Sequence, residues 1–157
     1  CCLGYDMGSL NPKPDGFGFL VPSRENRSIL GTVIDSNVFP NRAPNGHQLT
    51  RTLLGGARAP GHALQPEQKI VDSVLGELKG TLGISAEPVF AKVFRHERAI
   101  PQYLQGHASR LQEIVRRLGA FPGLTLTGNA FRGVSLNDCV ANAGVTAERL
   151  LGSGRDG

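Results

Sequence analysis

The hydrophobic period of this chain changes at Pro66, from the alternation typical of strands to the spacing typical of helices. Before Pro66, short runs with alternating apolar residues are separated by stretches rich in Gly, Pro, Asn and Ser. The runs are residues 16–22, 29–36 and 49–55. Successive short strands joined by turns predict an antiparallel meander.

After Pro66 the sequence predicts helices with one further strand between them. Residues 66–82 carry an apolar stripe at helical spacing, with Pro66 suited to the first turn and Gly83 to the stop. Residues 89–95 alternate like a strand, and residues 107–118 form a second amphipathic helix. A last strand at 124–127 follows, and then a last helix from Ser135, whose apolar residues, Leu136 and Val140 among them, are expected to face the interior. The opening residues 1–16 have no clear period and are expected to be an element that the sequence enters partway through, followed by a loop.

The bulk properties indicate a folded chain of mixed α/β class, the size of one ordinary domain. It has 157 residues, including 21 Gly and 10 Pro, so many turns are expected. The formal charge of +4 is spread over scattered arginines, which favours a solvated surface over a nucleic-acid groove. Attraction to anionic lipid or to an acidic substrate stays open.

Cysteine and histidine usage indicates a reducing compartment and no metal site. Cys1, Cys2 and Cys139 cannot build a framework of several disulfides, and neither they nor the four histidines have ligand spacing. No apolar run approaches the ~20 residues that span a bilayer, so any membrane contact is expected to be peripheral. A Ser-His-Asp triad, a carboxylate pair and a phosphate-binding glycine loop are also missing, which leaves no candidate residue for hydrolysis or phosphoryl transfer.

Residues 124–144 have the order strand, glycine turn, helix N-terminus. Gly128 and Gly133 break the strand pattern before Ser135 opens the helix. Such a turn presents unpaired backbone N–H groups to an electron-rich ligand, for example a phosphate or a cofactor carbonyl. An ordinary βα unit is the alternative. Asp138 has the spacing of a capping box with Ser135, so helix initiation is favoured over catalysis for this residue.

The first strand-like run contains a glycine at an unusual place. Phe17, Phe19 and Val21 share one face of the strand, while Gly18 and Leu20 share the other. A glycine inside a strand is tolerated where another backbone or a flat ligand approaches closely. A bulge or simple sheet packing would explain it equally well.

Five stretches together resemble the C-terminal part of the oxygen-dependent protoporphyrinogen oxidases, a family of FAD enzymes of haem and chlorophyll synthesis. They are GFGFLVPSRE at 16–25, ILGTVIDSNVFP at 29–40, LLGG at 53–56, AIPQYLQGH at 99–107 and LTGNAFRGVSLNDCV at 126–140. Their order and spacing also match, and the resemblance extends from Gly16 to about Leu151.

The resemblance implies FAD as cofactor, protoporphyrinogen IX as substrate and dioxygen as oxidant, with no catalytic side chain because the flavin carries the chemistry. Backbone groups at the start of the last helix would lie against the flavin. The implied cofactor-binding residues are Gly128, Asn129, Gly133, Val134, Ser135 and Leu136. The porphyrinogen would lie against an apolar wall. The implied substrate-binding residues are Phe17, Gly18, Leu20, Val33, Leu53 and Ile100.

The resemblance also implies the domain organisation. Residues 1–105 would belong to a substrate-binding domain with an antiparallel sheet, residues 106–151 would be the closing strand and helix of a Rossmann-like FAD domain, and 152–157 a frayed tail. The G-x-G-x-x-G turn of that domain is not in this sequence, so a C-terminal fragment of a larger two-domain flavoenzyme, inactive alone, is expected.

Two alternatives stay open: another flavin amine-oxidase-like desaturase or oxidase, and a non-catalytic module that binds a tetrapyrrole or a protein partner. The expected location is the cytoplasm or the surface of a membrane, an organelle membrane in a eukaryote. Assembly as a homodimer is left open.

Overall fold

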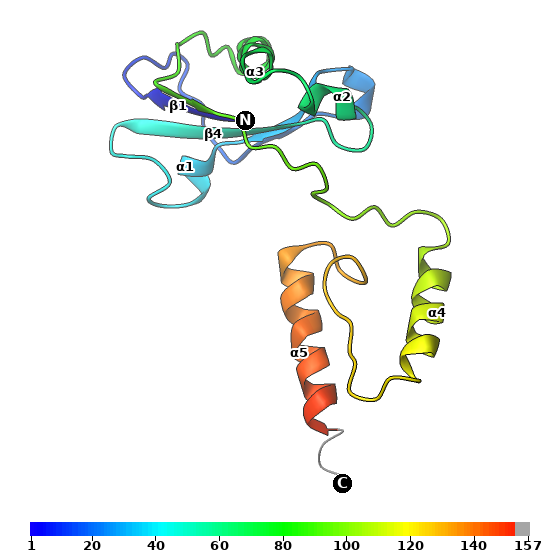
Figure 1. Cartoon of the computed structure of the whole chain (residues 1–157). Coiled ribbons are helices and arrows are strands. Elements are labelled where there is room, and N and C mark those ends of the chain that lie inside the picture. The colour runs from blue at the N-terminus through cyan, green and yellow to red at the C-terminus, as the bar shows by residue number, and fades with distance from the viewer. Residues whose placement is uncertain (153–157) are drawn as a thin grey trace. The chain divides into compact units, whose positions relative to one another are not determined.

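The computed structural model describes residues 1–152 and divides the chain into two compact units, Cys1–Arg95 and His96–Gly157 (Figure 1). Each unit is described by itself. The boundary expected between residues 105 and 106 falls inside the second unit, just before its first helix. Of the predicted frayed tail, residues 153–157 lie outside the described part of the chain.

The first unit contains a five-stranded sheet in the order β2-β3-β4-β1-β5, in which every neighbouring pair is antiparallel. The strands are β1 (Cys2–Asp6), β2 (Gly18–Leu20), β3 (Ile29–Val33), β4 (His47–Leu54) and β5 (Phe90–Lys92). The three predicted runs form β2, β3 and β4 as successive neighbours. The mixed α/β class and the antiparallel meander are therefore confirmed.

The opening residues form an element followed by a loop, as expected, and this element is strand β1, which lies between β4 and β5 inside the sheet. Leu3 and Tyr5 point to the core and are completely buried. Gly4, between them, faces Phe90, and a Cβ atom there would lie 3.1 Å from the Phe90 Cβ. Only two apolar residues alternate in this strand, and its glycine is set by a neighbour 86 positions away, so the local pattern is too short to reveal it.

The core of the first unit lies between the sheet and α3 (Glu67–Leu82), which covers one sheet face in Figure 1. Ile70, Val74 and Leu78 of α3 are buried against the strands, as the predicted apolar stripe requires. Gly83 ends the helix in the left-handed conformation, as predicted. The Tyr5 hydroxyl is buried here without a hydrogen bond among the described residues. Burial, and then the nearby Glu87 carboxylate, raise the pKa of Tyr5 to about 12.

Short helical turns connect the strands. A 3₁₀ turn, η1 (Ser23–Glu25), follows β2, and α2 (Pro60–Ala63) follows β4. The predicted strand at 29–36 is shorter than expected, since β3 ends at Val33 and α1 (Asp35–Val38) begins two residues later. Asp35 in the first turn of α1 forms an ion pair with Arg51 of β4.

The second unit contains α4 (His107–Leu118) and α5 (Leu136–Gly152), which match the two predicted helices. The predicted strand at 124–127 is not formed. A strand needs a hydrogen-bonded partner, and the described residues of this unit contain no other strand.

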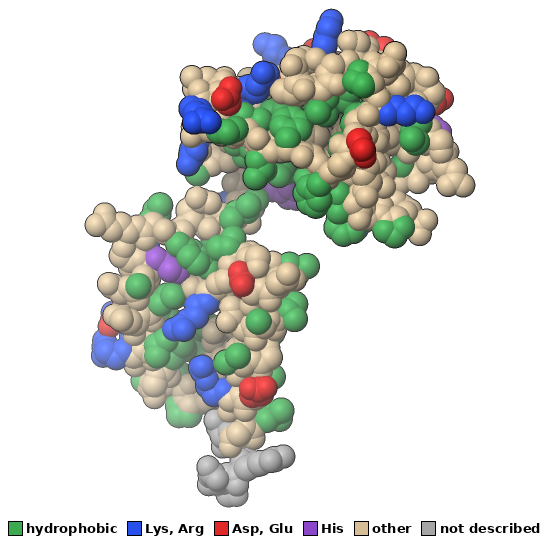
Figure 2. Space-filling view, turned by 180° about the vertical axis from the view of Figure 1, so that it is seen from behind, with side chains coloured by type: hydrophobic (Ala, Val, Ile, Leu, Met, Phe, Trp, Pro, Cys, Tyr) green, Lys and Arg blue, Asp and Glu red, His purple; other side chains and the backbone are tan. Residues whose placement is uncertain are grey.

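The expected burial of α5 is also not found. The residues predicted to face an interior are largely exposed, including Leu136 at 80% and Val140 at 66%. Figure 2 shows apolar side chains at the surface of this unit. Amphipathic spacing identifies the apolar face of a helix, but it does not say whether a partner covers it.

Candidate functional site

The sheet face opposite α3 brings together four of the six predicted substrate-binding residues. Gly18 pairs with Val33 across β2 and β3, while Leu20 and Leu53 both pair with Gly31 from its two sides. Residues paired across antiparallel strands point to the same face. Leu20 is 83% exposed and Leu53 48%, so this face, which we call the open face, presents an apolar surface.

Gly18 is required by the neighbouring strand. Its φ of +139° lies outside the range favoured by other residues, and a Cβ atom at this position would overlap the carbonyl oxygen of Thr32. Of the explanations left open by the sequence, close approach of another backbone is the one found. The open face therefore carries no side chain at position 18, because the close pairing of β2 with β3 leaves no room for a Cβ atom there.

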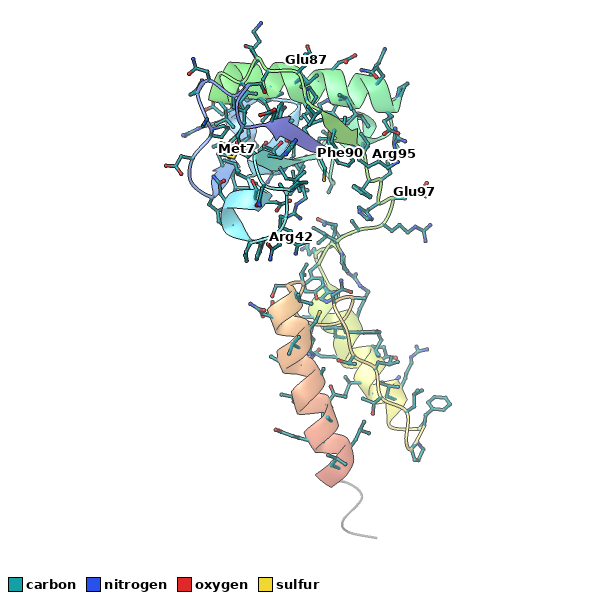
Figure 3. All side chains as sticks on the ribbon, turned by 90° about the vertical axis from the view of Figure 1, so that its left-hand side faces the viewer. Met7, Arg42, Glu87, Phe90, Arg95 and Glu97 are labelled. Carbon is teal, nitrogen blue, oxygen red and sulfur yellow. The ribbon has the colours of Figure 1, made fainter. Side chains whose placement is uncertain are left out.

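The other two predicted wall residues do not lie in the sheet. Phe17 precedes β2; its carbonyl oxygen accepts a hydrogen bond from the Ile34 N–H at 2.9 Å, and its ring is exposed. Ile100 belongs to the second unit and is also exposed. Phe90, on the edge strand β5, adds an exposed aromatic ring to the first unit, as Figure 3 shows together with Arg95, which follows it along the chain.

The open face also carries two cations that the sequence analysis did not select. Arg51 pairs with Val33 on one side and Cys2 on the other, and Cys2 pairs with Lys92. Arg51 donates two hydrogen bonds to Asp35, from Nε at 2.9 Å and from Nη2 at 2.8 Å, and this contact raises the pKa of Arg51. Alternation along β4 was the available signal, since Arg51 stands two residues before Leu53 and so shares its face.

The predicted cofactor-binding residues form one turn, 128–136, at the start of α5. Gly128 and Gly133 have φ values of +110° and +70°, which favour glycine. A Cβ atom on Gly133 would overlap the Asp138 side chain and lie 2.8 Å from Nδ2 of Asn142. Glycine at position 133 thus lets the turn pack directly against the first turns of α5.

Side chains from both helices hold this turn. The Tyr103 hydroxyl donates to the Asn129 carbonyl at 2.6 Å, and the Tyr103 ring stacks on His107 with 4.0 Å between centroids. His107 Nε2 lies 3.1 Å from the Phe131 carbonyl. From the other side, Cys139 Sγ donates to the Gly133 carbonyl at 3.3 Å. The backbone of the turn is therefore fixed at several points.

The start of α5 has the predicted capping box. The Asp138 N–H donates to Ser135 Oγ at 3.1 Å, while the Ser135 hydroxyl and N–H both donate to Asp138 Oδ2, at 2.7 and 3.4 Å. The N–H groups of Val134 and Leu136 have no hydrogen-bond partner among residues 1–152. These two donors, at the positive end of a 17-residue helix, fit the electron-rich carbonyl edge of a flavin ring.

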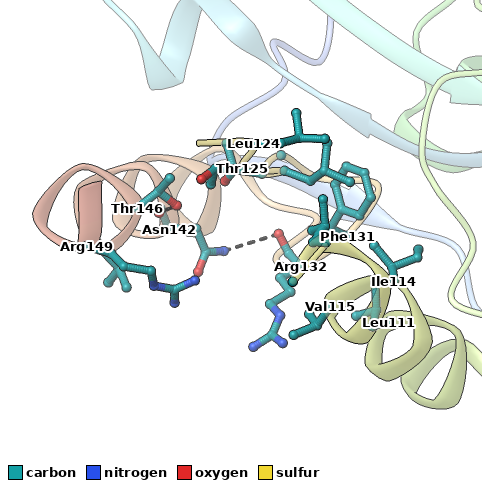
Figure 4. Close-up of a pocket in the computed structure, with 16 residues that line it drawn as sticks. Leu111, Ile114, Val115, Leu124, Thr125, Phe131, Arg132, Asn142, Thr146 and Arg149 are labelled. Atoms are coloured by element: carbon teal, nitrogen blue, oxygen red, sulfur yellow. Dashed lines mark hydrogen bonds between the residues drawn. The ribbon is translucent and has the colours of Figure 1, made fainter. Parts of the chain in front are cut away.

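A pocket of about 360 Å³ lies between α4, residues 124–128 and α5 (Figure 4). Leu111, Ile114 and Val115 of α4 form its apolar side. On the other side, Asn142 donates from Nδ2 to the Arg132 carbonyl at 3.2 Å. The apolar face of α4 lines this pocket, and for that reason none of its side chains is fully buried.

Within residues 1–152, no three His, Cys, Asp or Glu side chains come together in a way that could hold a metal ion. No helix in that range is long and apolar enough to cross a bilayer.

Comparison with known proteins supports the resemblance found in the sequence. Protoporphyrinogen oxidase of Bos taurus is 37% identical over 148 residues, which cover 88% of this chain and 30% of the relative. The chloroplastic protoporphyrinogen oxidase of Oryza sativa subsp. japonica is 35% identical, with 86% and 26% covered. Coproporphyrinogen III oxidase of Bacillus subtilis is 32% identical, with 88% and 30% covered. The chain thus spans less than a third of the length of these relatives.

A solved structure also matches. The crystal structure of a protein from Exiguobacterium sp. 255-15, which carries a protoporphyrinogen oxidase name, superimposes with a TM-score of 0.79 at 29% identity. The match covers 95% of this chain and 33% of that protein. The family model described as flavin containing amine oxidoreductase matches residues 7–151. Because this match covers nearly the whole sequence, the chain belongs to the flavin containing amine oxidoreductase family.

Proposed function

We propose that this chain is the C-terminal part of an FAD-dependent oxidase that converts protoporphyrinogen IX to protoporphyrin IX with dioxygen. The open face of the sheet is the observation that carries the proposal. Leu20 and Leu53 lie together on this face, and such an exposed apolar patch is typical of a binding surface. A largely apolar tetrapyrrole suits that surface.

The start of α5 is the proposed contact with the flavin. Val134 and Leu136 offer backbone donors, while the N–H of Ser135 is directed to Asp138 and is already used. We therefore assign the hydrogen bonds to the flavin to Val134 and Leu136, and helix initiation to Ser135. Gly128, Asn129 and Gly133 shape the approach.

The turn at 128–133 and the N–H groups of Val134 and Leu136 would hold the flavin, which would supply a hydride acceptor for a substrate carbon and a route for the electrons to dioxygen, with hydrogen peroxide as the product. The residues of this chain bind and orient. The N–H groups of Val134 and Leu136 would stabilise negative charge on the bound flavin. Leu20, Val33 and Leu53 hold the substrate by apolar contact and keep water from that side of it.

Oxidation of coproporphyrinogen III is the second candidate. The relative from Bacillus subtilis that carries this name is 32% identical and matches the same share of this chain as the bovine protoporphyrinogen oxidase does. The two substrates share the macrocycle and differ in the number of carboxylate arms. The proposed cofactor and reaction type are the same for both.

The proposal is tested with the enzyme encoded by the complete reading frame. After purification, flavin content is measured by visible absorbance, and porphyrin formation in air is followed by fluorescence with protoporphyrinogen IX and coproporphyrinogen III in parallel. Protoporphyrinogen IX is expected to have the higher kcat/KM. The reverse order would favour the second candidate. Flavin-loaded protein that oxidises neither would overturn the proposal and favour a non-catalytic tetrapyrrole-binding module or an oxidase of another substrate.

Location is part of the proposal as well. The relatives include proteins named for the chloroplast and for the mitochondrion. We infer either a cytoplasmic enzyme or peripheral contact with a membrane, an organelle membrane in a eukaryote. Fractionation of cells into soluble and membrane pools, with a salt wash of the membranes, distinguishes the two.

A further inference from the structure

The open face changes character from one side of the sheet to the other. Register pairs connect five residues in a single row, running from β2 to β5. The row is Gly18, Val33, Arg51, Cys2 and Lys92. Its β2–β3 side is apolar, and its β4–β5 side carries two cations. With strands about 4.8 Å apart, Arg51 and Lys92 are separated by roughly 10 Å across β1.

Arg51 is held in place and still has donors to offer. Its bonds to Asp35 use Nε and Nη2, so the guanidinium is fixed from one side. Nη1 has no hydrogen bond in the described part of the chain, and the side chain is 46% exposed. An arginine fixed in this way loses little conformational entropy when it binds a carboxylate.

Lys92 is the second cation of the row. It is exposed on the edge strand β5, and within residues 1–152 its side chain makes neither an ion pair nor a hydrogen bond. The carboxylate of Asp35 offsets the charge of Arg51, which leaves the charge of Lys92 uncompensated in this row. Strand alternation also assigns Asp6 to the open face. Asp6 lies on β1 four residues after Cys2, and its carboxylate accepts a hydrogen bond from the Gly8 N–H.

We propose that Arg51 and Lys92 anchor a carboxylate arm of the porphyrinogen, while the apolar part of the open face contacts the macrocycle. This inference rests on the proposed function. The match is one of charge complementarity: an apolar ring with anionic arms meets an apolar strip that has two cations along one side. Neither residue takes part in the chemical step. Their role is to bind and orient the substrate.

The test compares protoporphyrinogen IX with its dimethyl ester, which lacks the negative charges. Lys92→Met in the complete enzyme is the primary variant, because Lys92 has no partner whose loss would disturb the fold. Its KM for the free acid is expected to rise about tenfold, with kcat and flavin content within about twofold of wild type. Its KM for the ester should be unchanged.

Arg51→Met is the second variant, and it leaves Asp35 without its partner. If the loss of this ion pair disturbed the fold, KM would rise for the ester as well as for the free acid. A rise in the ratio of KM for the acid to KM for the ester therefore reports only the contact between Arg51 and the substrate carboxylate. Arg24→Met, on the exposed turn η1, is the matched control and should change neither substrate's KM.

Equal effects on acid and ester, or no effect of Lys92→Met on either, would overturn the inference. A flavin-loaded wild-type enzyme that oxidises neither compound would instead overturn the proposed function, so the two failures are distinguishable.

Discussion

At the scale of single residues, Glu77 of helix α3 forms hydrogen bonds with Arg27 and Ser28 in the turn that precedes β3. Its Oε1 accepts hydrogen bonds from the Ser28 N–H at 2.8 Å and the Ser28 hydroxyl at 2.9 Å, and Arg27 donates to Oε2 at 3.0 Å. Partial burial alone would raise the pKa of Glu77, but the bonds from Ser28 and Arg27 outweigh it, so the pKa lies below its ordinary value of 4.5. The contact therefore depends on the ionised carboxylate.

Glu77→Gln is expected to lower the free energy of unfolding by about 1–2 kcal/mol at neutral pH, because charge-assisted hydrogen bonds are lost. A lowered folded-state pKa stabilises above the unfolded value of 4.5, and this stabilisation disappears as the pH falls through the folded-state value. Wild type and variant should therefore converge in acid. Urea unfolding from neutral pH down to about pH 3 measures the gap, and a gap that is constant with pH would contradict the assignment.

Gly18 and Leu20 provide a second residue-scale prediction for the complete enzyme. Gly18→Ala places a methyl group against the Thr32 carbonyl and should cost about 1–3 kcal/mol of stability. Flavin content and porphyrinogen turnover should then fall together, because pairing of β2 with β3 is weakened.

Leu20→Ala removes an exposed side chain from the same face and should reduce turnover while flavin content stays constant. If Leu20→Ala left kcat/KM unchanged, β2 would not line the substrate site.

At the scale of elements, the sequence predicted those whose pattern is local. Apolar stripes at helical spacing correctly identified α3, α4 and α5, and the glycine that ends α3 was recognised from its position. The element at the start of the chain was expected but not identified as strand β1, because only Leu3 and Tyr5 alternate there as a buried apolar pair. Residues 124–127 alternate like a strand but have no strand to pair with in the described unit. Pairing depends on distant segments, which local periodicity does not contain.

The candidate site likewise contains residues that local alternation predicts and residues whose position depends on pairing with distant segments. Alternation placed Gly18 and Leu20 on one face, and the register of β3 and β4 adds Val33 and Leu53 to it. Arg51 was overlooked although alternation along β4 assigns it to the same face as Leu53, whereas its ion pair with Asp35 depends on the unexpected helix α1. The roles of Gly18, Leu20, Val33 and Leu53 in binding remain predictions from the resemblance.

The capping box of α5 gives a prediction at the element scale. Ser135→Ala removes the acceptor of the Asp138 N–H and should cost roughly 1 kcal/mol at the helix start. Because that start orients the N–H groups of Val134 and Leu136, the Kd for flavin in the complete enzyme should rise about fivefold. Ser109→Ala in the first turn of α4 is the matched control. Flavin titration of the apo-enzyme measures both, and equal Kd values for the two variants would separate the cap from cofactor binding.

At the scale of the whole molecule, the two units differ in how much they bury. The core residues of the first unit come from strands β1 and β3, helix α3 and the segments beside them. In the described part of the second unit, residues 96–152, no side chain is fully buried. Under the proposed function, the remainder of a flavin domain would cover the apolar face of α5, where Leu136, Val140 and Leu151 are exposed.

This difference predicts that only the first unit folds by itself. A piece with residues 1–95 keeps the sheet, α3 and the whole core, so it should unfold cooperatively in urea, with the sharp transition of a small domain. A piece with residues 96–157 contains two helices without a core between them, and helices of 12 and 17 residues are marginal when unsupported. It should show partial helicity by circular dichroism that declines gradually with temperature. The intact chain, studied in parallel, should give the transition of the 1–95 piece. A sharp transition in the 96–157 piece would mean that α4 and α5 stabilise each other through the pocket between them, and that the second unit is a domain in its own right.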